Sequence, residues 1–404
     1  MSELEKLLDV GKREVEHGLE LHQKSIVCDS LCRDPEPWTD RMIQKANEMM
    51  DANRSLGEIR RTLGLGWGNA GLLQAELAEN SDARKDYANA WEASGVTCIG
   101  LTLPVLDLEN AYRTIAVEST KFSLFSEFLT KTTKGEHIRE AKRKGMHANL
   151  FQFQRSIWVG GYHNLEQELN NIDIFHNLGV RVMQLTYNLQ DLVGVGCTER
   201  HDSGLTHFGM RVVERMNRLG MLVDVFHCGE QTTLDAIEAS KEPVAATHII
   251  CKALVDFPRG KTDEAIQAIA EKDGYIGITG LKTFTKPPPM VGTLRDWLDH
   301  IDHAVRLVGA DHVGIASDIR HRSRYPSRLE ELEKKARYTD GWWGGFRPEH
   351  EMERAPRYPK DDDIMAWANW PNITIGLVSR GYSDHEIRKI IGESYLKIIE
   401  RVIG

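Results

Sequence analysis

The sequence predicts an α/β fold, a (β/α)8 TIM barrel, and three observations lead to that fold class. Eight short segments are rich in apolar β-forming residues, helical patterns separate them, and several segments are nearly continuous in apolar or small residues. Continuous apolar strands are typical of a parallel sheet covered on both faces, and a strand and a helix repeated eight times form a closed barrel. The expected strands are 25–31, 96–103, 146–153, 180–187, 222–228, 243–249, 274–280 and 312–319.

Two of the expected helices show the amphipathic pattern most clearly. In 206–221, "THFGMRVVERMNRLGM", the large apolar residues fall on one helical face and Gly220 ends the helix. The last helix, 383–403, opens with Ser383 and Glu386 at the spacing of a capping box and carries a row of isoleucines on one face. Such helices are suited to cover the outside of a barrel, because only one of their faces needs to be buried.

The whole chain, 1–404, is predicted to form a single barrel domain with two insertions. A helical insertion, 35–94, follows the first expected strand, and a second insertion, 320–371, follows the eighth. Strands one and eight are neighbours in a closed barrel, so the insertions are expected side by side over its carboxyl end. The second is rich in tryptophan, which favours a lid or a subunit contact over a plain surface loop. Its tryptophans are Trp342, Trp343, Trp367 and Trp370.

Composition and charge narrow the classes of partner. The formal charge is −9 and the basic residues are spread through the helices, which argues against a nucleic acid partner. No apolar stretch reaches the roughly 20 residues that cross a bilayer, and the N-terminus is a charged amphipathic helix, so we expect a cytoplasmic protein without membrane contact. The six cysteines are then expected as free thiols, and Cys28 and Cys32 lack the second pair that a structural zinc site needs.

Three side chains of the kind that bind metals stand at the carboxyl ends of expected strands, where active sites of this fold lie. His227 ends the fifth strand in "VDVFHCG", His248 ends the sixth and Asp318 ends the eighth. Two imidazoles from adjacent strands and a carboxylate across the mouth suit a divalent transition metal such as zinc. A single buried histidine is more often a satisfied core residue, but three such residues at equivalent positions favour a site. A bound metal would polarise a carbonyl and bring the pKa of its water toward neutrality.

Further polar residues are expected around the same opening. Gln152 or Gln154 ends the third strand, Tyr187 ends the fourth, and Arg33 follows the first. Arg259 lies on a loop directly before a helix, where its guanidinium can hold a substrate carboxylate through two hydrogen bonds. The alternative for Arg259 is an ordinary surface arginine.

Several motifs of the chain resemble those of the renal, or membrane, dipeptidase family of amidohydrolase-like metallohydrolases. The similarity is dense from about Leu178 to Ile319 and covers roughly half of the chain. The motifs are "LGVRVMQLTYN", "GLTHFGMRVVERMNRLGMLVDVFHCG", "ASKEPVAATH", "DFPRGKTDEAIQAIAEKDGYIGI", "HVGIASDI" and, near the end, "PNITIGLVSRGYSDHEIRKIIGESYLKII". The resemblance implies a (β/α)8 barrel, two zinc ions with a bridging hydroxide, and cleavage of a dipeptide or related amide. Members are commonly dimers, so a homodimer is expected.

The resemblance also assigns site residues. The two histidines of the family's second zinc fall on His227 and His248, and the carboxylate after the eighth strand falls on Asp318. The arginine that binds the substrate carboxylate falls on Arg259. The histidine that polarises the substrate carbonyl is replaced by Tyr187, in "LTYN".

The chain departs from the family at the first zinc. The family's Asp-x-His-x-Asp is Asp29-Ser30-Leu31-Cys32-Arg33 here, so Leu31 and Arg33 replace two ligands. The bridging glutamate is replaced by Gln154 or, on another alignment, by Val159. A permanent cation stands where a dication would be, and carboxylates that offset its charge are gone, so a two-zinc centre is not expected.

Two alternatives remain for the metal. In the first, one zinc ion stays on His227 and His248, with Asp318 or the Cys228 thiol. In the second, no metal is bound and Arg33 supplies the positive charge that stabilises an anionic substrate or oxyanion.

We therefore expect a metal-dependent hydrolase acting on a small dipeptide or amino-acid-derived amide that carries a carboxylate. Tyr187 and Asp318 would assist the chemistry, and Arg259 and Gln154 would bind the substrate. The first alternative is a different chemistry on an N-methylated amino acid or betaine, as in a similar divergent branch of the family, with the insertion's tryptophans binding the ammonium through cation–π contacts. The second is a barrel that binds a ligand without catalysis.

Overall fold

Eight parallel strands form a nearly closed barrel at the centre of the molecule, which confirms the predicted fold class. The computed structural model describes residues 2–65, 71–103, 107–156, 164–286, 291–340 and 363–404, with the backbone only for 334–340. Neighbouring strands follow the order β1-β2-β4-β5-β6-β7-β9-β10. Their bounds are Cys28–Cys32 (β1), Cys98–Leu103 (β2), His147–Phe153 (β4), Val182–Gln184 (β5), Leu222–Asp224 (β6), Ala245–Cys251 (β7), Tyr275–Thr279 (β9) and Val313–Ala316 (β10).

The ring closes between the last strand and the first. The Asp318 amide donates to the Leu31 carbonyl at 2.9 Å, and the Ser30 hydroxyl donates to the Ile315 carbonyl at 3.0 Å. Two further short strands, β3 (Leu129–Thr132) beside β4 and β8 (Gly260–Lys261) beside β7, lie off this ring and were not expected from the sequence.

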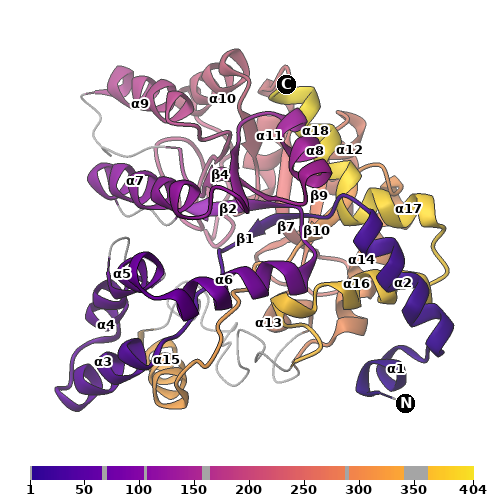
Figure 1. Cartoon of the computed structure of the whole chain (residues 1–404). Helices are drawn as coiled ribbons and strands as arrows, with labels where there is room; N and C mark the ends of the chain where they lie inside the picture. The colour runs from indigo at the N-terminus through magenta and orange to yellow at the C-terminus, as the bar shows by residue number, and fades with distance from the viewer. Residues whose placement is uncertain (1, 66–70, 104–106, 157–163, 287–290, 341–362) are drawn as a thin grey trace.

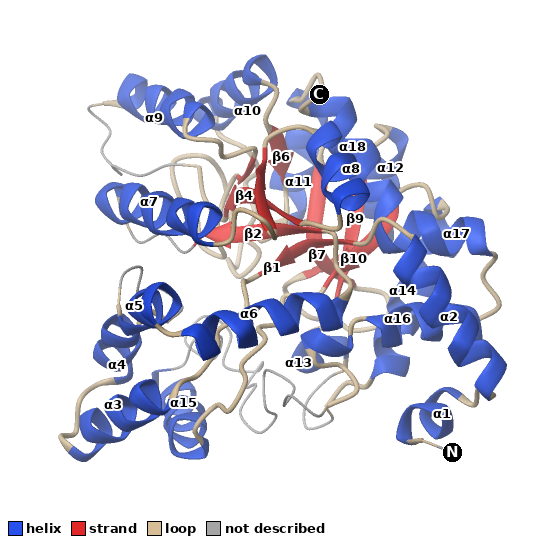
Figure 2. Cartoon of the chain, viewed as in Figure 1, coloured by secondary structure: helices blue, strands red, loops and turns tan. Residues whose placement is uncertain are grey.

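Helices surround the sheet, as Figures 1 and 2 show. Because nearly every strand residue is buried, the strands are covered both by these helices and by the side chains inside the ring. The α-helices are α1 (Glu3–Leu8), α2 (Lys12–Lys24), α3 (Asp40–Asp51), α4 (Leu56–Leu63), α5 (Leu72–Glu79), α6 (Ser81–Ser94), α7 (Leu108–Leu124), α8 (Gly135–Lys144), α9 (Leu165–Asn177), α10 (His207–Leu219), α11 (Glu230–Ala239), α12 (Asp263–Glu271), α13 (Lys282–Thr285), α14 (Leu294–Val308), α15 (Ser327–Asp340), α16 (Pro371–Ser379), α17 (Asp384–Arg388) and α18 (Ser394–Val402). No helix of the described part of the chain has the length and apolar character that a membrane crossing requires.

The two helices singled out in the sequence form with the expected ends, with one irregularity. In α10, Thr206 caps the N-terminus and Gly220 ends the helix in the left-handed conformation, at φ 67°. The last helix begins with the Ser383–Glu386 capping box but contains one π-helical turn, Lys389–Glu393. A Cβ atom on Gly392 would lie 2.1 Å from the Ile26 carbonyl oxygen, so the π turn places a glycine where the helix passes close to the segment before β1.

Three helices of the first insertion, α3, α4 and α5, gather at one corner of the molecule, whereas α6 runs beneath the barrel (Figure 1). Figure 1 shows α3, α4 and α5 there, with α15 of the second insertion against α3 and α4. The Arg60 guanidinium binds the Glu333 carboxylate at 2.7 Å, and Arg322 binds both Glu333 at 3.3 Å and Glu36 at 3.1 Å. These buried or half-buried ion pairs join the two insertions. That the second insertion forms a lid or a subunit contact stays a prediction.

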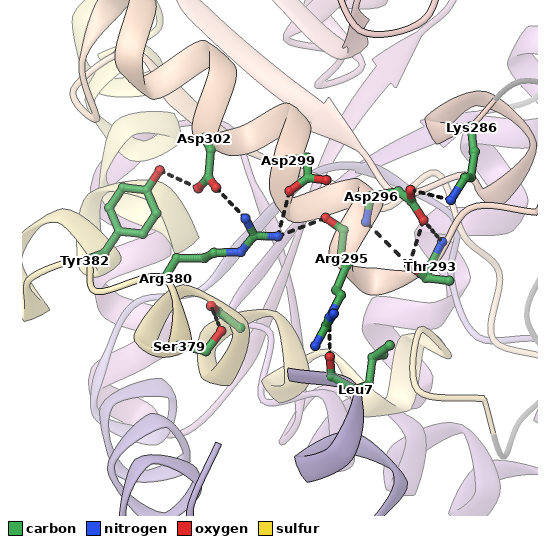
Figure 3. A network of polar contacts seen from close by, with 11 residues as sticks. Leu7, Lys286, Thr293, Arg295, Asp296, Asp299, Asp302, Ser379, Arg380 and Tyr382 are labelled. Carbon is green, nitrogen blue, oxygen red and sulfur yellow. Dashed lines mark hydrogen bonds and ion pairs between the residues drawn. The ribbon is translucent and has the colours of Figure 1, made fainter. Parts of the chain in front are cut away.

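A second polar network fastens the N-terminal and C-terminal helices to α14, and Figure 3 shows it from close by. The Arg380 guanidinium, at the end of α16, binds Asp299 at 2.7 Å and Asp302 at 2.9 Å on α14. From the same helix Arg295 donates to the carbonyl of Leu7 in α1. The first helix of the chain is therefore held on the outside of the barrel.

Trp367 and Trp370 of the second insertion are core residues, with 1% and 2% of their surface exposed. Trp370 donates its indole N–H to the Asp29 carboxylate at 3.2 Å, and Trp367 packs edge-on against Trp91. Burial raises the pKa of Asp29 to about 6, against hydrogen bonds from Ser317 and Trp370 that lower it. The expectation that these two tryptophans form a ligand surface is therefore wrong, while Trp342 and Trp343 lie outside the described residues.

Candidate functional site

Three residues at the carboxyl end of the barrel have a left-handed backbone. Asn188 follows β5 with φ 63°, His227 follows β6 with φ 55°, and Asp318 follows β10 with φ 49°. This conformation costs a residue with a side chain about 1 kcal/mol or more, and it clusters at functional sites because there the surrounding structure enforces it. The strain falls on two of the predicted ligands, His227 and Asp318.

The imidazoles of His227 and His248 lie next to one another, with ring centroids 5.4 Å apart and exposed fractions of 1% and 0%. The Nδ1 atom of His227 lies 2.5 Å from the Asn188 amide oxygen. Because that oxygen can only accept, the hydrogen of this ring is on Nδ1. The Nε2 atom of His227 therefore carries a lone pair.

A chain of hydrogen bonds sets the same form of His248. The Thr247 hydroxyl donates to the Asp224 carboxylate at 2.6 Å, so its oxygen accepts from Nδ1 of His248 at 2.8 Å. Burial raises the pKa of Asp224 to about 6, and hydrogen bonds from Thr247 and Phe226 oppose this rise. His248 thus also presents an Nε2 lone pair. Imidazoles held through Nδ1 in this way are typical of metal ligands and of histidines that accept protons.

Arg259 is buried, with 4% exposed, and its guanidinium stands between the predicted ligands. Its Nη2 atom lies 3.4 Å from His227 Nε2 and 3.6 Å from the Asp318 carboxylate. The guanidinium carbon lies 4.4 Å and 4.3 Å from the ring centres of Phe226 and Phe284. The surface-arginine alternative is therefore wrong, and the planar guanidinium is held between two aromatic rings.

Gln154 contacts His248, and Tyr187 contacts His227. The Gln154 amide nitrogen donates to Nε2 of His248 at 3.1 Å, and the Tyr187 ring lies 4.1 Å from the His227 ring between centroids. Gln154 therefore contacts the His248 atom through which a metal would bind. Val159, the other candidate for the bridging position, lies outside the described residues.

The first-strand positions lack metal ligands. Leu31 is fully buried, and Arg33 is half-buried. Burial alone would raise the pKa of Glu36, but Arg320, Arg322 and Arg33 lower it below its ordinary value. Arg33 thus takes part in the charge cluster of the insertions, and a catalytic role for it stays a prediction.

The donor set does not fit the family's two-zinc centre. Across the part of the chain that the structure describes, no three or more His, Cys, Asp and Glu side chains form a group that could hold a metal ion. The Cys228 thiol accepts from the Thr186 hydroxyl at 3.4 Å, and burial raises its pKa to about 11. All six cysteines are free, as expected. Two imidazole Nε2 atoms remain as nitrogen donors, and the Arg259 guanidinium that lies beside His227 Nε2 also contacts the Asp318 carboxylate.

Several residues that shape this site were not among the predicted ones. Asn188 and Thr247 each follow or precede a predicted site residue directly, and Asp224 starts the "DVFH" segment. A polar residue next to a candidate ligand is the signal that could have found them. The two phenylalanines around Arg259 gave no such signal, because apolar residues are expected throughout a barrel.

The comparisons with known proteins agree with this architecture. A solved amidohydrolase from Pseudomonas aeruginosa aligns with 96% of this chain and 99% of its own, at a TM-score of 0.66 and 25% identity. A solved structure described as dipeptidase AC, a metallo peptidase, covers 94% of this chain at a TM-score of 0.62. At 17% identity the latter supports the fold alone.

Curated relatives are dipeptidases. "Dipeptidase tcpJ" of Claviceps purpurea is 25% identical over 297 residues, 73% of this chain, and an uncharacterized dipeptidase of Schizosaccharomyces pombe is 29% identical over 184 residues. These matches span 60% and 44% of the relatives' own lengths. The family model described as membrane dipeptidase (peptidase family M19) matches residues 126–340, more than half of the chain. The chain therefore belongs to the membrane dipeptidase family.

Proposed function

We propose that the chain is a metal-dependent hydrolase of the dipeptidase type that acts on a small dipeptide or amino-acid-derived amide. The observation that carries the proposal is the pair of buried imidazoles, His227 and His248, whose Nε2 lone pairs are fixed by Asn188 and Thr247. A satisfied core histidine has no need of a buried cation at 3.4 Å, as Arg259 provides for His227. Family membership supports the same reaction class.

Each remaining side chain has a proposed role. Arg259 binds the substrate carboxylate, because a guanidinium already held flat between two rings loses little freedom when it forms two hydrogen bonds. Asp318, next to that guanidinium, accepts the proton of the attacking water. Tyr187, half-buried against His227, donates to the oxyanion that develops on the amide carbonyl. Gln154 orients the amide from the side of His248.

One divalent ion would be held by His227 and His248 as nitrogen ligands and Asp318 as an oxygen ligand, three side chains that form no such group among the described residues in the present arrangement and must come closer to bind it. Such an ion would polarise the carbonyl and lower the pKa of its water. Gln154 and Arg259 now contact the two Nε2 atoms, so both must move away from them for an ion to bind. Arg259 would then be directed toward the substrate carboxylate.

The test is hydrolysis of a panel of dipeptides, each with a free or an amidated C-terminus, together with zinc content measured on the same protein. We expect cleavage of the free-carboxylate peptides and about one zinc ion per chain. His248→Ala should lower kcat/KM by about 100-fold or more and remove the zinc. His303→Ala, which removes a partly buried histidine of α14 that is paired with Asp263, is the matched control and should leave both unchanged.

Three results would contradict the proposal. Two zinc ions per chain would contradict the proposal that the site holds one ion. Full hydrolysis by the His248→Ala variant would show that the reaction takes place at another site. Equal rates with free and amidated C-termini would contradict the proposal that Arg259 binds the substrate carboxylate.

We also propose a cytoplasmic location and a homodimer. The N-methylated or betaine substrate loses the support of Trp367 and Trp370, since both are buried.

A further inference from the structure

A polar cavity of about 210 Å³ lies beside the candidate site. Its wall is formed by the loop around Cys197, the start of α11, and the loop that leads into β8. Cys228 and Gly260 both line it, and these residues are the chain neighbours of His227 and Arg259. An occupant of the cavity would therefore lie against the backbone that carries two of the proposed site residues.

Lys261 lines this cavity and is buried, with 3% of its surface exposed. Its ammonium donates to the Cys228 carbonyl at 2.8 Å and to the Thr233 hydroxyl at 2.6 Å. Both acceptors are neutral, and no carboxylate of a described residue forms an ion pair with Lys261 within 4.0 Å. Lys261 also interacts electrostatically with the Asp224 carboxylate, but that carboxylate already accepts a hydrogen bond from the Thr247 hydroxyl.

A buried ammonium without a paired anion is costly, and it has three N–H groups to satisfy. Two of them meet the neutral acceptors. The third N–H, together with the unbalanced charge, favours an anionic group from a ligand in the cavity.

The other charges of the lining decide which anion suits the cavity. The wall carries charges of both signs, with Glu199, Asp202, Glu230 and Asp256 on the acidic side and Arg200 and Lys252 beside Lys261 on the basic side. A ligand that itself carries one charge of each sign suits such a wall better than a multiply charged anion does. Two of these acids have an oxygen to offer. Glu199 uses Oε1 for the Gln190 amide at 2.9 Å, and Glu230 uses Oε1 for the Thr262 hydroxyl. Within the described structure their Oε2 atoms accept no hydrogen bond, so both carboxylates can receive an ammonium.

We infer that the cavity binds a free α-amino acid in its zwitterionic form, with the carboxylate on Lys261 and the ammonium on Glu199 and Glu230. The meaning of this site rests on the proposed function, because hydrolysis of a dipeptide releases free amino acids. The cavity is then a product site next to the reaction centre, and its occupancy reports that product has accumulated.

The test is calorimetric titration of the full chain with L-alanine, and with acetate and ethylamine, which each carry one of the two charged groups. We expect L-alanine to bind, and each single-charge probe to bind at least about tenfold more weakly. Lys261→Met should weaken L-alanine binding by about tenfold or more. Glu199→Gln should weaken L-alanine and ethylamine but leave acetate unchanged.

Two control variants keep the inference separable from the proposed function. Lys272→Met removes another lysine that donates to a carbonyl, that of Ile237, away from the cavity, and should not alter binding. His248→Ala should abolish hydrolysis and still bind L-alanine, so failure of the reaction leaves the binding result readable. If Lys261→Met unfolds, Lys261→Arg retains the charge and should retain binding.

The inference is overturned if no variant or wild-type chain binds L-alanine, or if Lys261→Met binds it as the wild type does. It is also overturned if His248→Ala loses binding while Lys261→Met keeps it, because the amino acid would then occupy the reaction centre itself.

Discussion

At the scale of single residues, the state of His248 depends on one hydroxyl group. The Thr247 hydroxyl donates to the Asp224 carboxylate at 2.6 Å and accepts from Nδ1 of the imidazole at 2.8 Å. A valine at this position would keep the shape of the side chain and lose the hydrogen bonds. The ring could then place its hydrogen on either nitrogen.

Thr247→Val should therefore lower kcat/KM and zinc affinity by about 10-fold to 100-fold. The measurement is zinc titration with the dipeptide assay, because a purely structural defect would not change metal affinity in proportion to activity. Thr279→Val removes another buried threonine, at the end of β9, and serves as the control. Unchanged zinc affinity in Thr247→Val would contradict the role given to this hydroxyl.

The sequence was informative about which residues reach the site and uninformative about what they touch there. His227, His248 and Asp318 could be named because the expected strands end at them, and strand ends of a barrel share one rim. In the structure His227 and Asp318 lie beyond the ends of β6 and β10, and His248 lies within β7. The place of Arg259 could not be predicted, since its contacts with Phe226 and Phe284 depend on how two distant loops fold against each other.

At the scale of elements, helix α2 is held by a buried histidine. Nε2 of His22 donates to the Ser94 carbonyl of α6 at 2.9 Å, and Nδ1 accepts from the Thr374 hydroxyl of α16 at 2.8 Å. Burial lowers the pKa of His22 to about 4, although the hydrogen bond to Ser94 raises it. The contact with Thr374 requires the neutral ring, because a protonated imidazole has no nitrogen left to accept a hydrogen bond.

The stability of the fold should therefore depend on pH through His22. Because its folded pKa lies below the unfolded value of about 6.5, the neutral ring stabilises the fold above pH 6.5, and this contribution is lost as the pH falls toward about 4. The loss should be about 3 kcal/mol at most. His22→Gln should lack this part of the acid destabilisation in urea melts between about pH 7 and 4.

His17→Gln, on the same helix but half-exposed and paired with Asp384, is the matched control and should retain the wild-type pH dependence. His300, with a pKa also lowered to about 4 by burial, contributes similarly in all three proteins, so the difference between them isolates His22. Equal pH profiles for wild type and His22→Gln would exclude this role.

The ion pairs between the insertions give a second prediction at this scale. Glu333→Gln would leave Arg60 and Arg322 without their shared carboxylate in a buried setting, and should lower the free energy of unfolding by about 3 kcal/mol. Arg328→Ala breaks an exposed pair with Asp51, and should cost less than about 1 kcal/mol. Chemical denaturation measures the free energy of unfolding of both variants. Equal losses would show that burial does not make the Glu333 ion pairs contribute more to stability than the exposed pair does.

Element positions followed the sequence pattern where the pattern was long. The eight barrel strands and helix α10 form where they were expected, but β5 and β6 are three residues long and thus shorter than the expected 180–187 and 222–228. Strand β8 consists of two residues and is too short to carry a pattern. The π turn at Gly392 could not be predicted either, because the close contact of this turn is with Ile26, which is remote in sequence.

At the scale of the whole molecule, the ring closes where the chain's first and last strands meet. The Ser317 amide donates to the buried Asp29 carboxylate at 2.8 Å, beside the Asp318–Leu31 hydrogen bond. Strands from both ends of the chain thus complete one sheet, and neither half buries its strands alone.

We therefore predict a single cooperative unfolding transition for the chain of 404 residues, as the one-domain expectation requires. In differential scanning calorimetry the calorimetric and van 't Hoff enthalpies should agree. Two separated transitions, with the insertions melting before the barrel, would contradict it.

The left-handed residues at the rim have a consequence for engineering. Asn188, His227 and Asp318 occupy backbone conformations that glycine adopts without penalty. A selection for higher stability would therefore favour glycine at these three positions. The resulting barrel would be more stable but would lack the side chains proposed to act at the site.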